Sequence, residues 1–308
     1  MADDRENIPE MYKHVKLVTR SAGNGRLGGV GVYDNLVPAL QRGDLIVHDD
    51  DIWIISYPKS GTQWMNDTAG FIMSKGDKEK FDAIPRNHPL EVLMGATPEE
   101  RIAAINAKSG IRLFQTHLRF DELPPALRNG KAKIIFVMRN PKDVAVSYFH
   151  FHRSNAMLGG IKDWVFSKFF PYYASGDVFY GDFFDYVLEF WQQRANMQNM
   201  CIVKYEDMKK DQLGGIRRMA EFLGQSLTDE EVMKVAEHTG IKQSRERILQ
   251  VVKPTEKAKL IIDQSVSLFV RKGEIGDWKN HFTVAENEIY NKRICEKMEG
   301  SDLHFDYE

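Results

Sequence analysis

The passage that most constrains the fold runs from residue 53 to residue 76 and reads WIISYPKSGTQWMNDTAGFIMSKG. Its first five residues are mostly apolar and predict a buried strand over 53–57. After Thr62 the apolar side chains recur at helical spacing as far as Met73, and Gly76 is placed to end that helix. A strand, a tight loop and the first turn of a helix therefore follow one another without interruption.

This order of elements predicts an anion site. The first four amides of a helix have no partner inside the helix, so they point at whatever lies before it. Lys59 lies in the loop, and Ser60 and Thr62 add hydroxyl donors. The loop is not a Walker A motif, whose lysine follows the second glycine, because Lys59 precedes the single glycine, Gly61. Taken alone, the same residues also fit an ordinary strand-to-helix turn.

Further strands and helices alternate along the chain. Apolar runs predict strands over 111–116, 132–138 and 200–203, and the second run is apolar on both faces, as in a parallel sheet. The expected helices cover residues 34–41, 90–94, 98–107, 209–223, 228–238 and 286–298, with another that begins at 141. This alternation predicts an α/β fold with a central parallel β-sheet flanked by helices. No repeat or Pro/Ser-rich linker divides the chain, so we expect a single domain over 1–308, with 1–30 as an irregular N-terminal arm.

Composition narrows the class of protein. Lys and Arg number 42 against 44 Asp and Glu, so a net charge of −2 gives no basis for nucleic-acid binding. Two cysteines, Cys201 and Cys295, do not make a disulfide framework and suit a reducing compartment. The sequence contains no run of about 18 apolar residues, so no membrane span is predicted, and the first residues show no apolar signal-peptide core. We therefore expect a soluble, cytoplasmic protein.

Two further segments combine basic side chains with features of anion sites. In RNPKDVAVS, Arg139 closes the 132–138 strand, Asn140 is placed as a helix N-cap, and Ser147 lies two turns into the helix. In RKGEIGDWK, which begins at Arg271, glycines beside basic residues let the backbone approach a ligand. Each segment alone also fits a solvated surface.

Together the three segments resemble the cytosolic sulfotransferases, which use 3′-phosphoadenosine 5′-phosphosulfate (PAPS). The resemblance runs from about Val47 to Met298 and includes YPKSGTQW, THL, RNPKDVAVSYFHFHR, KYEDM and RKGEIGDWKNHFTV. It implies a P-loop-like strand–loop–helix that binds the phosphosulfate. The implied reaction moves a sulfuryl group from PAPS to a hydroxyl, of a phenol or an alcohol, or to an amine of a small, largely apolar acceptor. In-line displacement then leaves 3′-phosphoadenosine 5′-phosphate (PAP), and no metal is required.

The resemblance also implies a role for individual residues. The catalytic residues are Lys59, which stabilises the leaving oxygen, His117, which takes the acceptor's proton, and Ser147. The implied cofactor-binding residues are Lys59, Ser60, Gly61, Thr62, Gln63, Trp64, Arg139, Ser147, Tyr205, Thr239, Phe269, Arg271, Lys272 and Gly273. Within that set, Trp64 stacks on adenine, and the 3′-phosphate is bound by Arg139, Ser147, Arg271, Lys272 and Gly273. Phe151 and His117 are expected to face the acceptor. His150 and His152 are expected to be structural, with an alternative place for His152 at the edge of the acceptor pocket.

Three positions depart from the family's pattern. Gln115 replaces a common lysine, Gln63 replaces a common threonine, and Gly240 with Ile241 replaces a serine and an aromatic residue beside adenine. Gln115 removes a positive charge near the sulfuryl group, and Gly240 with Ile241 lacks the aromatic ring that sandwiches adenine, so we expect cofactor binding to be weaker than is typical.

A last segment resembles the family's dimerisation motif and predicts a homodimer through Lys279, Thr283, Val284 and Glu288. Two other functions stay open on the sequence alone. One is a relative that binds PAPS or PAP with little or no transfer, and the other is an ATP-using P-loop kinase. The acceptor also stays open among phenols, steroid alcohols and amines.

Overall fold

A computed structural model of the chain describes residues 18–20, 27–29, 35–92, 96–155, 158, 161–251 and 263–308. The chain divides into two compact units, each assembled from stretches that are distant in sequence. We call the first the sheet unit, which comprises Val30–Arg139 and Glu189–Gly240. The second, here the helical unit, comprises Met1–Gly29, Asn140–Leu188 and Ile241–Glu308.

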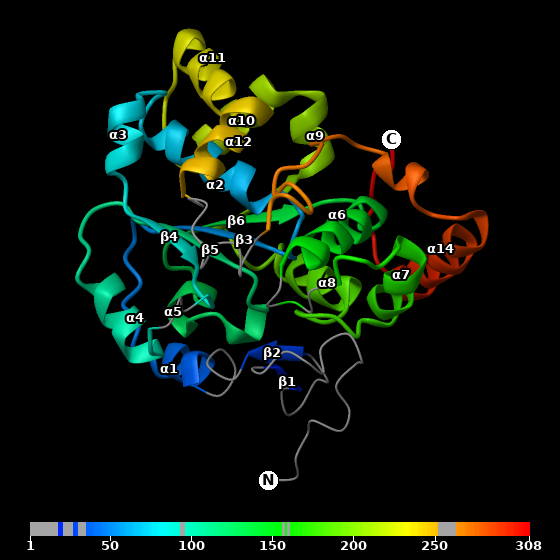
Figure 1. Ribbon diagram of the computed structural model, residues 1–308. Helices are drawn as coiled ribbons and strands as arrows, with labels where there is room; N and C mark the ends of the chain where they lie inside the picture. The colour runs from blue at the N-terminus through cyan, green and yellow to red at the C-terminus, as the bar shows by residue number, and fades with distance from the viewer. Residues whose placement is uncertain are drawn as a thin grey trace. The chain divides into compact units, whose positions relative to one another are not determined.

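The sheet unit is built on five parallel strands in the spatial order β4-β5-β3-β6-β7 (Figure 1). The strands are β3 (Ile52–Ser56), β4 (Arg86–Pro89), β5 (Leu113–Thr116), β6 (Lys133–Met138) and β7 (Met200–Lys204). The parallel α/β fold and four of these strands are as predicted. The helix expected over 90–94 is wrong for its described part, because β4 ends at Pro89 and a turn follows it, while residues 93–95 lie outside the described residues.

One face of the sheet carries the larger core of this unit. The side chains of Ile52 and Ile54 on β3 and of Ile135 and Val137 on β6 are buried on this face. They pack against α2 (Thr62–Met73), α10 (Gln212–Phe222) and α11 (Asp229–His238), which cover that side of the sheet in Figure 1. Packing of these helices against the sheet fixes where α2 starts relative to β3. It therefore fixes the loop between β3 and α2, which is the loop that the sequence singles out.

Aromatic side chains fill the opposite face. Trp53 pairs in register with Phe114 of β5, and their rings stack with centroids 4.3 Å apart. Phe136 of β6 stacks in the same way on Phe190, also at 4.3 Å. Because strand residues alternate between faces, both sides of the sheet are apolar, which explains why the strands read as continuous hydrophobic runs.

The remaining helices of the sheet unit are short. They are α1 (Val37–Arg42), α3 (Lys78–Ala83), α4 (Pro98–Asn106), α5 (Pro125–Arg128), α9 (Tyr205–Lys210) and the 3-10 turn η4 (Phe120–Glu122). Thr97 before α4 and Thr228 before α11 each form a capping box with a glutamate three residues later. The helices expected over 98–107 and 228–238 are confirmed, and the single helix expected over 209–223 is interrupted at Asp211, between α9 and α10.

The helical unit has an aromatic core. Its elements are β1 (Val18–Arg20), β2 (Leu27–Gly29), α6 (Pro141–Ser154), α7 (Phe166–Ser175), α12 (Ile241–Val251), η6 (Asp277–Asn280) and α14 (Val284–Met298), and most of α8 (Phe183–Gln193). The antiparallel pair β1–β2 lies within the segment expected to be an irregular arm. Tyr290 of α14 is buried among rings that include Phe170 and Tyr173 of α7. Most of the aromatic residues that crowd the sequence from 148 to 191 are therefore core.

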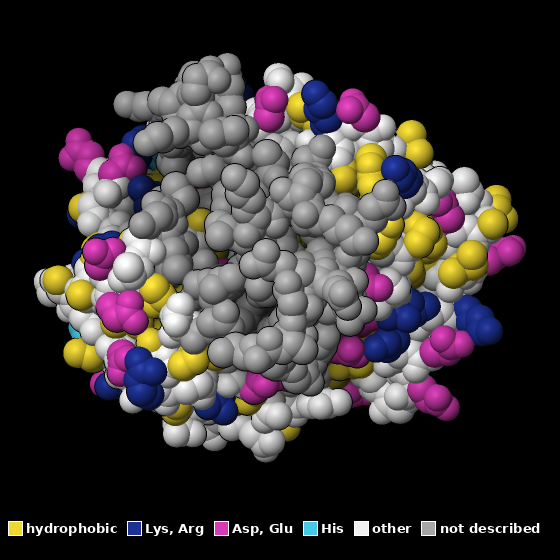
Figure 2. Space-filling view, turned by 60° about the horizontal axis from the view of Figure 1, so that its bottom comes forward, with side chains coloured by type: hydrophobic (Ala, Val, Ile, Leu, Met, Phe, Trp, Pro, Cys, Tyr) yellow, Lys and Arg dark blue, Asp and Glu magenta, His cyan; other side chains and the backbone are white. Residues whose placement is uncertain are grey.

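On the face shown in Figure 2, Lys and Arg side chains alternate with Asp and Glu over the described surface. Among the described residues, no helix combines the length and the apolar character that crossing a bilayer requires. The same residues contain no group of three or more His, Cys, Asp and Glu side chains arranged to hold a metal ion.

Candidate functional site

The carboxyl ends of the five parallel strands bring the residues predicted for the site in the sheet unit to one edge, together with Glu91. In spatial order from β4 to β7, the strands deliver Glu91, His117, the loop 57–61, Arg139 and Tyr205. In open α/β sheets, ligands bind outside this edge, where loops and helix starts converge. The parallel topology alone therefore gathers residues that span much of the sequence.

The loop between β3 and α2 is shaped to receive an anion. Lys59 has a positive φ of 72° and Gly61 one of 110°, so the chain turns sharply before the helix begins. Gly61 supplies no side-chain cap to α2, and the first amides of the helix are left to an outside acceptor. The hydroxyl of Ser60 is fully buried without a hydrogen-bond partner. A phosphate oxygen would satisfy both the amides and this hydroxyl, so the loop fits the phosphosulfate that the resemblance implies.

The ring of Tyr205, at the start of α9, organises the neighbouring residues. A Cβ added to Gly61 would lie 2.8 Å from the ring's Cδ2 atom, so this position has room only for glycine. The Trp64 ring meets the Tyr205 ring edge-on with centroids 5.2 Å apart. The guanidinium carbon of Arg139 lies 4.3 Å from the centroid of the same ring. Four residues that the resemblance assigns to the cofactor thus form one cluster.

Two of the three departures from the family's pattern contact each other. The amide Nε2 of Gln115 donates to Oε1 of Gln63 at 3.3 Å, and Nε2 of Gln63 donates to Oδ1 of Asp67 at 2.9 Å. Gln115 and Asp67 are both buried. Two linked neutral amides, bonded in turn to the carboxylate of Asp67, therefore occupy the positions where the family commonly has a lysine and a threonine.

His117 follows β5 directly and is held by its ring. Its Nδ1 atom lies 2.7 Å from the carbonyl oxygen of Ser56, and because a carbonyl can only accept, Nδ1 carries the hydrogen. In the neutral ring the lone pair is then on Nε2. Burial lowers the pKa of His117, as does the charge of Lys59, while Glu91 and the Ser56 carbonyl oppose that shift. A neutral imidazole with a defined basic nitrogen is what a general base requires.

Sequence reasoning missed Glu91. Its buried carboxylate accepts the backbone N–H of His117 and the hydroxyl of Thr116, each at 2.8 Å. No pattern in the sequence points to this contact, because β4 is a four-residue strand (RNHP) without an apolar run.

In the helical unit, the two basic side chains that open the 271–279 segment are paired with Asp277. Arg271 and Lys272 both form ion pairs with its carboxylate, and Asn280 donates to it at 3.0 Å. Burial raises the pKa of Asp277, but the hydrogen bonds from Lys272 and Arg271 outweigh it and keep that pKa well below its ordinary value. A second carboxylate, that of Asp143, accepts the backbone N–H groups of residues 276 and 278, at 2.8 and 2.9 Å.

The other predicted residues have these positions. Ser147 is partly buried on α6, whose N-cap is Asn140, as expected. Phe151, expected at the acceptor, contacts Phe269, expected at the cofactor, with ring centroids 5.8 Å apart. Thr239 is buried at the end of α11, where its hydroxyl donates to the carbonyl of Val235 at 2.8 Å. None of these contacts tests the assigned roles, which stay predictions.

Helix α6 carries two further histidines. His152 is fully buried, its Nδ1 lies 2.9 Å from the Tyr148 carbonyl oxygen, and burial lowers its pKa to about 3. His150 contacts His281 edge-on at 5.3 Å, and burial together with Arg271 lowers its pKa to about 3. Both side chains are therefore neutral at physiological pH, and the structural role expected of them stays a prediction.

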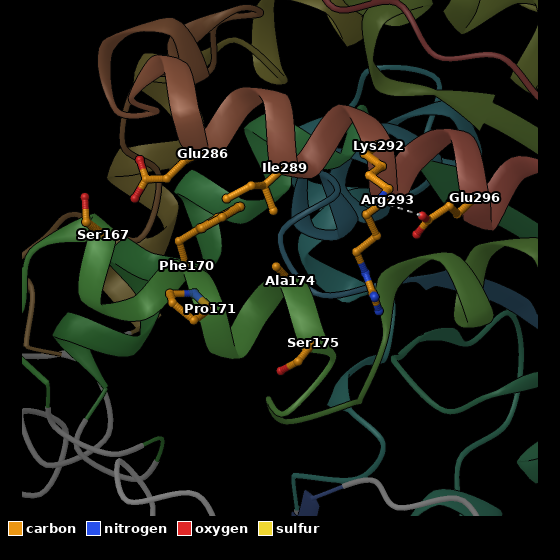
Figure 3. A pocket seen from close by; sticks show the side chains of 10 residues that line it. All are labelled: Ser167, Phe170, Pro171, Ala174, Ser175, Glu286, Ile289, Lys292, Arg293 and Glu296. Atoms are coloured by element: carbon orange, nitrogen blue, oxygen red, sulfur yellow. Dashed lines mark ion pairs between the residues drawn. The ribbon is translucent and has the colours of Figure 1, made fainter.

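A separate groove runs between α7 and α14 in the helical unit (Figure 3). It is lined by Ser167, Phe170, Pro171, Ala174 and Ser175 from α7 and by Glu286, Ile289, Lys292, Arg293 and Glu296 from α14. None of these side chains belongs to the predicted site, so the groove carries no part of the proposed chemistry.

Comparisons with known proteins agree with the resemblance. The profile of the family described as "Sulfotransferase domain" matches residues 49–302. Sulfotransferase 1C2 of Homo sapiens is 35% identical over 258 residues, which cover 83% of this chain and 86% of that protein. Sulfotransferase 1A1 of Bos taurus is 34% identical over 261 residues, which cover 84% and 87%. The crystal structure of mouse sulfotransferase SULT7A1 complexed with PAP aligns with a TM-score of 0.75 at 29% identity, over 93% of this chain and 95% of that one. The chain belongs to the sulfotransferase family.

Proposed function

We propose that this protein is a PAPS-dependent sulfotransferase, which transfers a sulfuryl group to a small-molecule acceptor. One observation carries the proposal: Lys59 lies in an anion loop at the N-terminus of α2, and the neutral, ring-anchored His117 follows the adjacent strand of the same sheet. Family membership supports it, as does the likeness to the mouse sulfotransferase that was crystallised with PAP. A kinase that uses ATP is not favoured, because the matching family transfers sulfuryl groups.

The chemistry assigns a distinct task to each of these residues. PAPS supplies the sulfuryl group, whose bond to the bridging phosphate oxygen breaks as a bond to the acceptor oxygen or nitrogen forms, with PAP as the leaving group. The Nε2 atom of His117 takes the proton of the attacking group. The ammonium of Lys59 offsets the negative charge that grows on the bridging oxygen. The buried hydroxyl of Ser60 and the first amides of α2 bind the 5′-phosphate oxygens.

The remaining cofactor assignments belong to the proposal on the strength of the resemblance. Trp64 stacks on the adenine, and Tyr205 and Thr239 contact the adenine and its surroundings. Phe269 is assigned to the cofactor without a particular group. The 3′-phosphate is assigned to Arg139, Ser147, Arg271, Lys272 and Gly273. PAP carries a 3′-phosphate that ADP lacks, so loss of any of these basic side chains should weaken PAP binding more than ADP binding.

Acceptor class, assembly and location are further parts of the proposal. Phe151 favours a phenol as acceptor, since flat apolar molecules bind against aromatic rings. A homodimer through Lys279, Thr283, Val284 and Glu288 is consistent with the 77% exposure of Val284 at the start of α14. A mass from light scattering that matches one chain would contradict the dimer. A cytoplasmic location fits the two free cysteines, Cys201 and Cys295.

The direct test is acceptor-dependent formation of PAP. The protein would be incubated with PAPS and a panel of phenols, alcohols and amines, and both PAP and the sulfated product would be quantified by mass spectrometry. We expect the two products to form in equal amounts and only when an acceptor is present. PAP formation without a sulfated product, or no reaction with any class of acceptor despite PAPS binding, would contradict the proposal and favour a relative that binds without transfer.

A further inference from the structure

The carboxylate of Glu91 connects two consecutive residues at the end of β5. Its Oε1 atom accepts the backbone N–H of His117 and its Oε2 atom accepts the hydroxyl of Thr116, both at 2.8 Å. The Thr116 hydroxyl in turn accepts the N–H of Leu118 at 3.1 Å. One acidic side chain thus holds the backbone on both sides of the predicted base.

The opposite side of His117 is fixed by another strand. Its ring Nδ1 donates to the carbonyl oxygen of Ser56, at the end of β3, at 2.7 Å. The backbone of His117 is therefore anchored by the segment after β4, and its ring is anchored by β3. These two strands are the neighbours of β5 on either side. With both anchors present, the direction of the Nε2 lone pair is set by the sheet itself.

Burial makes the position of Glu91 informative. The residue is only 4% exposed, and a buried carboxylate is tolerated where hydrogen bonds satisfy it. A carboxylate with only a structural role at the end of the sheet could accept hydrogen bonds from any nearby backbone N–H groups. Here one carboxylate oxygen bonds to the residue that carries the base, and the other bonds to the residue before it.

We propose that Glu91 is a positioning residue for sulfuryl transfer, holding the main chain of His117 so that Nε2 faces the attacking group of the acceptor. This inference rests on the proposed function, because it gives Glu91 a role in that reaction. A shift of about 1 Å in a catalytic group is enough to lower a rate by about 100-fold, so the effect of losing this anchor is measurable.

The test compares E91Q with E189Q in the full chain. Glu189, which is partly buried in the sheet unit, is the control, since it too accepts a side-chain donor, Arg119 at 2.6 Å, and a backbone N–H, that of Asp121 at 3.4 Å. We expect E91Q to lower kcat by about 10- to 100-fold while the Kd for PAP stays unchanged. E189Q should retain both constants.

The pH profile separates positioning from general loss of structure. The Glu91 charge opposes the lowering of the His117 pKa by burial and by Lys59, so E91Q should move the acid limb of kcat/KM to lower pH. The shorter carboxylate of E91D keeps the charge, and it should leave that limb near its original pH while kcat falls. A structural role alone would not move the limb.

A second variant keeps the inference testable if E91Q does not fold. T116V removes the hydroxyl that bonds to Glu91 without introducing a buried charge, and it should lower kcat without changing the PAP affinity. Unchanged kcat in both E91Q and T116V, or an E91Q loss matched by E189Q, would overturn the inference. Absence of sulfuryl transfer in the unmodified protein would instead contradict the proposed function.

Discussion

The ring Nδ1 of His117 and the carbonyl oxygen of Ser56 are 2.7 Å apart, although 61 positions separate the two residues in the chain. This hydrogen bond joins the ends of the adjacent parallel strands β5 and β3. It fixes the tautomer of the imidazole with hydrogen on Nδ1, and it leaves Nε2 as the basic atom. The proposed catalysis depends on this pair, and so does the first prediction.

The acid limb of the pH profile should report His117. The neutral ring is the active form, so kcat/KM should be constant above the pKa of this residue and fall as the pH drops through it. Burial places that pKa below the ordinary 6.5, and the midpoint of the limb should lie below 6.5 as well. H117A should lose about 10² to 10⁴ in kcat. A midpoint at or above 6.5, or full activity in H117A, would show that another group is the base.

Lys59 combines a charge with a strained backbone, and two substitutions separate them. K59M removes the ammonium and keeps the left-handed φ of 72°, whereas K59G removes both. Each variant should lose about 10² to 10³ in kcat, since the leaving oxygen is no longer stabilised. In urea unfolding, K59G should nevertheless be more stable than K59M, with a free energy of unfolding that is higher by about 1 kcal/mol. Activity of K59M close to that of the unmodified protein would contradict the role given to the charge.

Gly61 should tolerate no side chain. G61A places a Cβ 2.8 Å from the Tyr205 ring at a φ of 110°, while G43A meets a similar φ of 84° with no atom within 4 Å. The control should lose about 1 kcal/mol of unfolding free energy from backbone strain alone. G61A should lose a further 1 to 3 kcal/mol, roughly, from the clash. Equal losses in urea unfolding would mean that the ring moves aside without strain.

The fold is predictable where its signals are local. The strand, loop and helix around Lys59 are adjacent in sequence, and the caps Asn140 and Thr228 each act within three residues. By contrast, β4 contains a proline and no apolar run, so neither periodicity nor composition marks it. Its place beside β5 sets the Glu91 contact, and strand order is a property of the assembled sheet that a single sequence does not carry.

The same reason explains why the contact between the two amides is not predictable from the sequence. Gln63 and Gln115 each stand out as departures from the family's pattern, but 52 positions separate them. They meet only because β3 pairs with β5 and α2, which carries Gln63, starts just after β3. The expectation of weak cofactor binding, which also rests on Gly240 and Ile241, is not tested by their contact and stays a prediction.

A double-mutant cycle tests whether the two amides act together. Because Gln115 donates to Gln63, Q63A and Q115A should each reduce the unfolding free energy, and the double variant should lose less than their sum, with a coupling of about 0.5 to 1 kcal/mol. Gln41 bonds instead to the carbonyls of Asp121 and Leu123, so Q41A paired with Q115A should be additive. Additive losses in both cycles would show that the contact between the two amides contributes no stability.

The most direct test of the central claim, that this chain binds PAPS through its 3′-phosphate, is thermal unfolding with PAP and with ADP at equal concentration. A ligand present at 100 times its Kd adds about 2.7 kcal/mol to the free energy of unfolding. We predict a clear rise in Tm with PAP and a much smaller one with ADP, and loss of that difference in R139A. An equal rise with both nucleotides, or no rise with either, would contradict the claim.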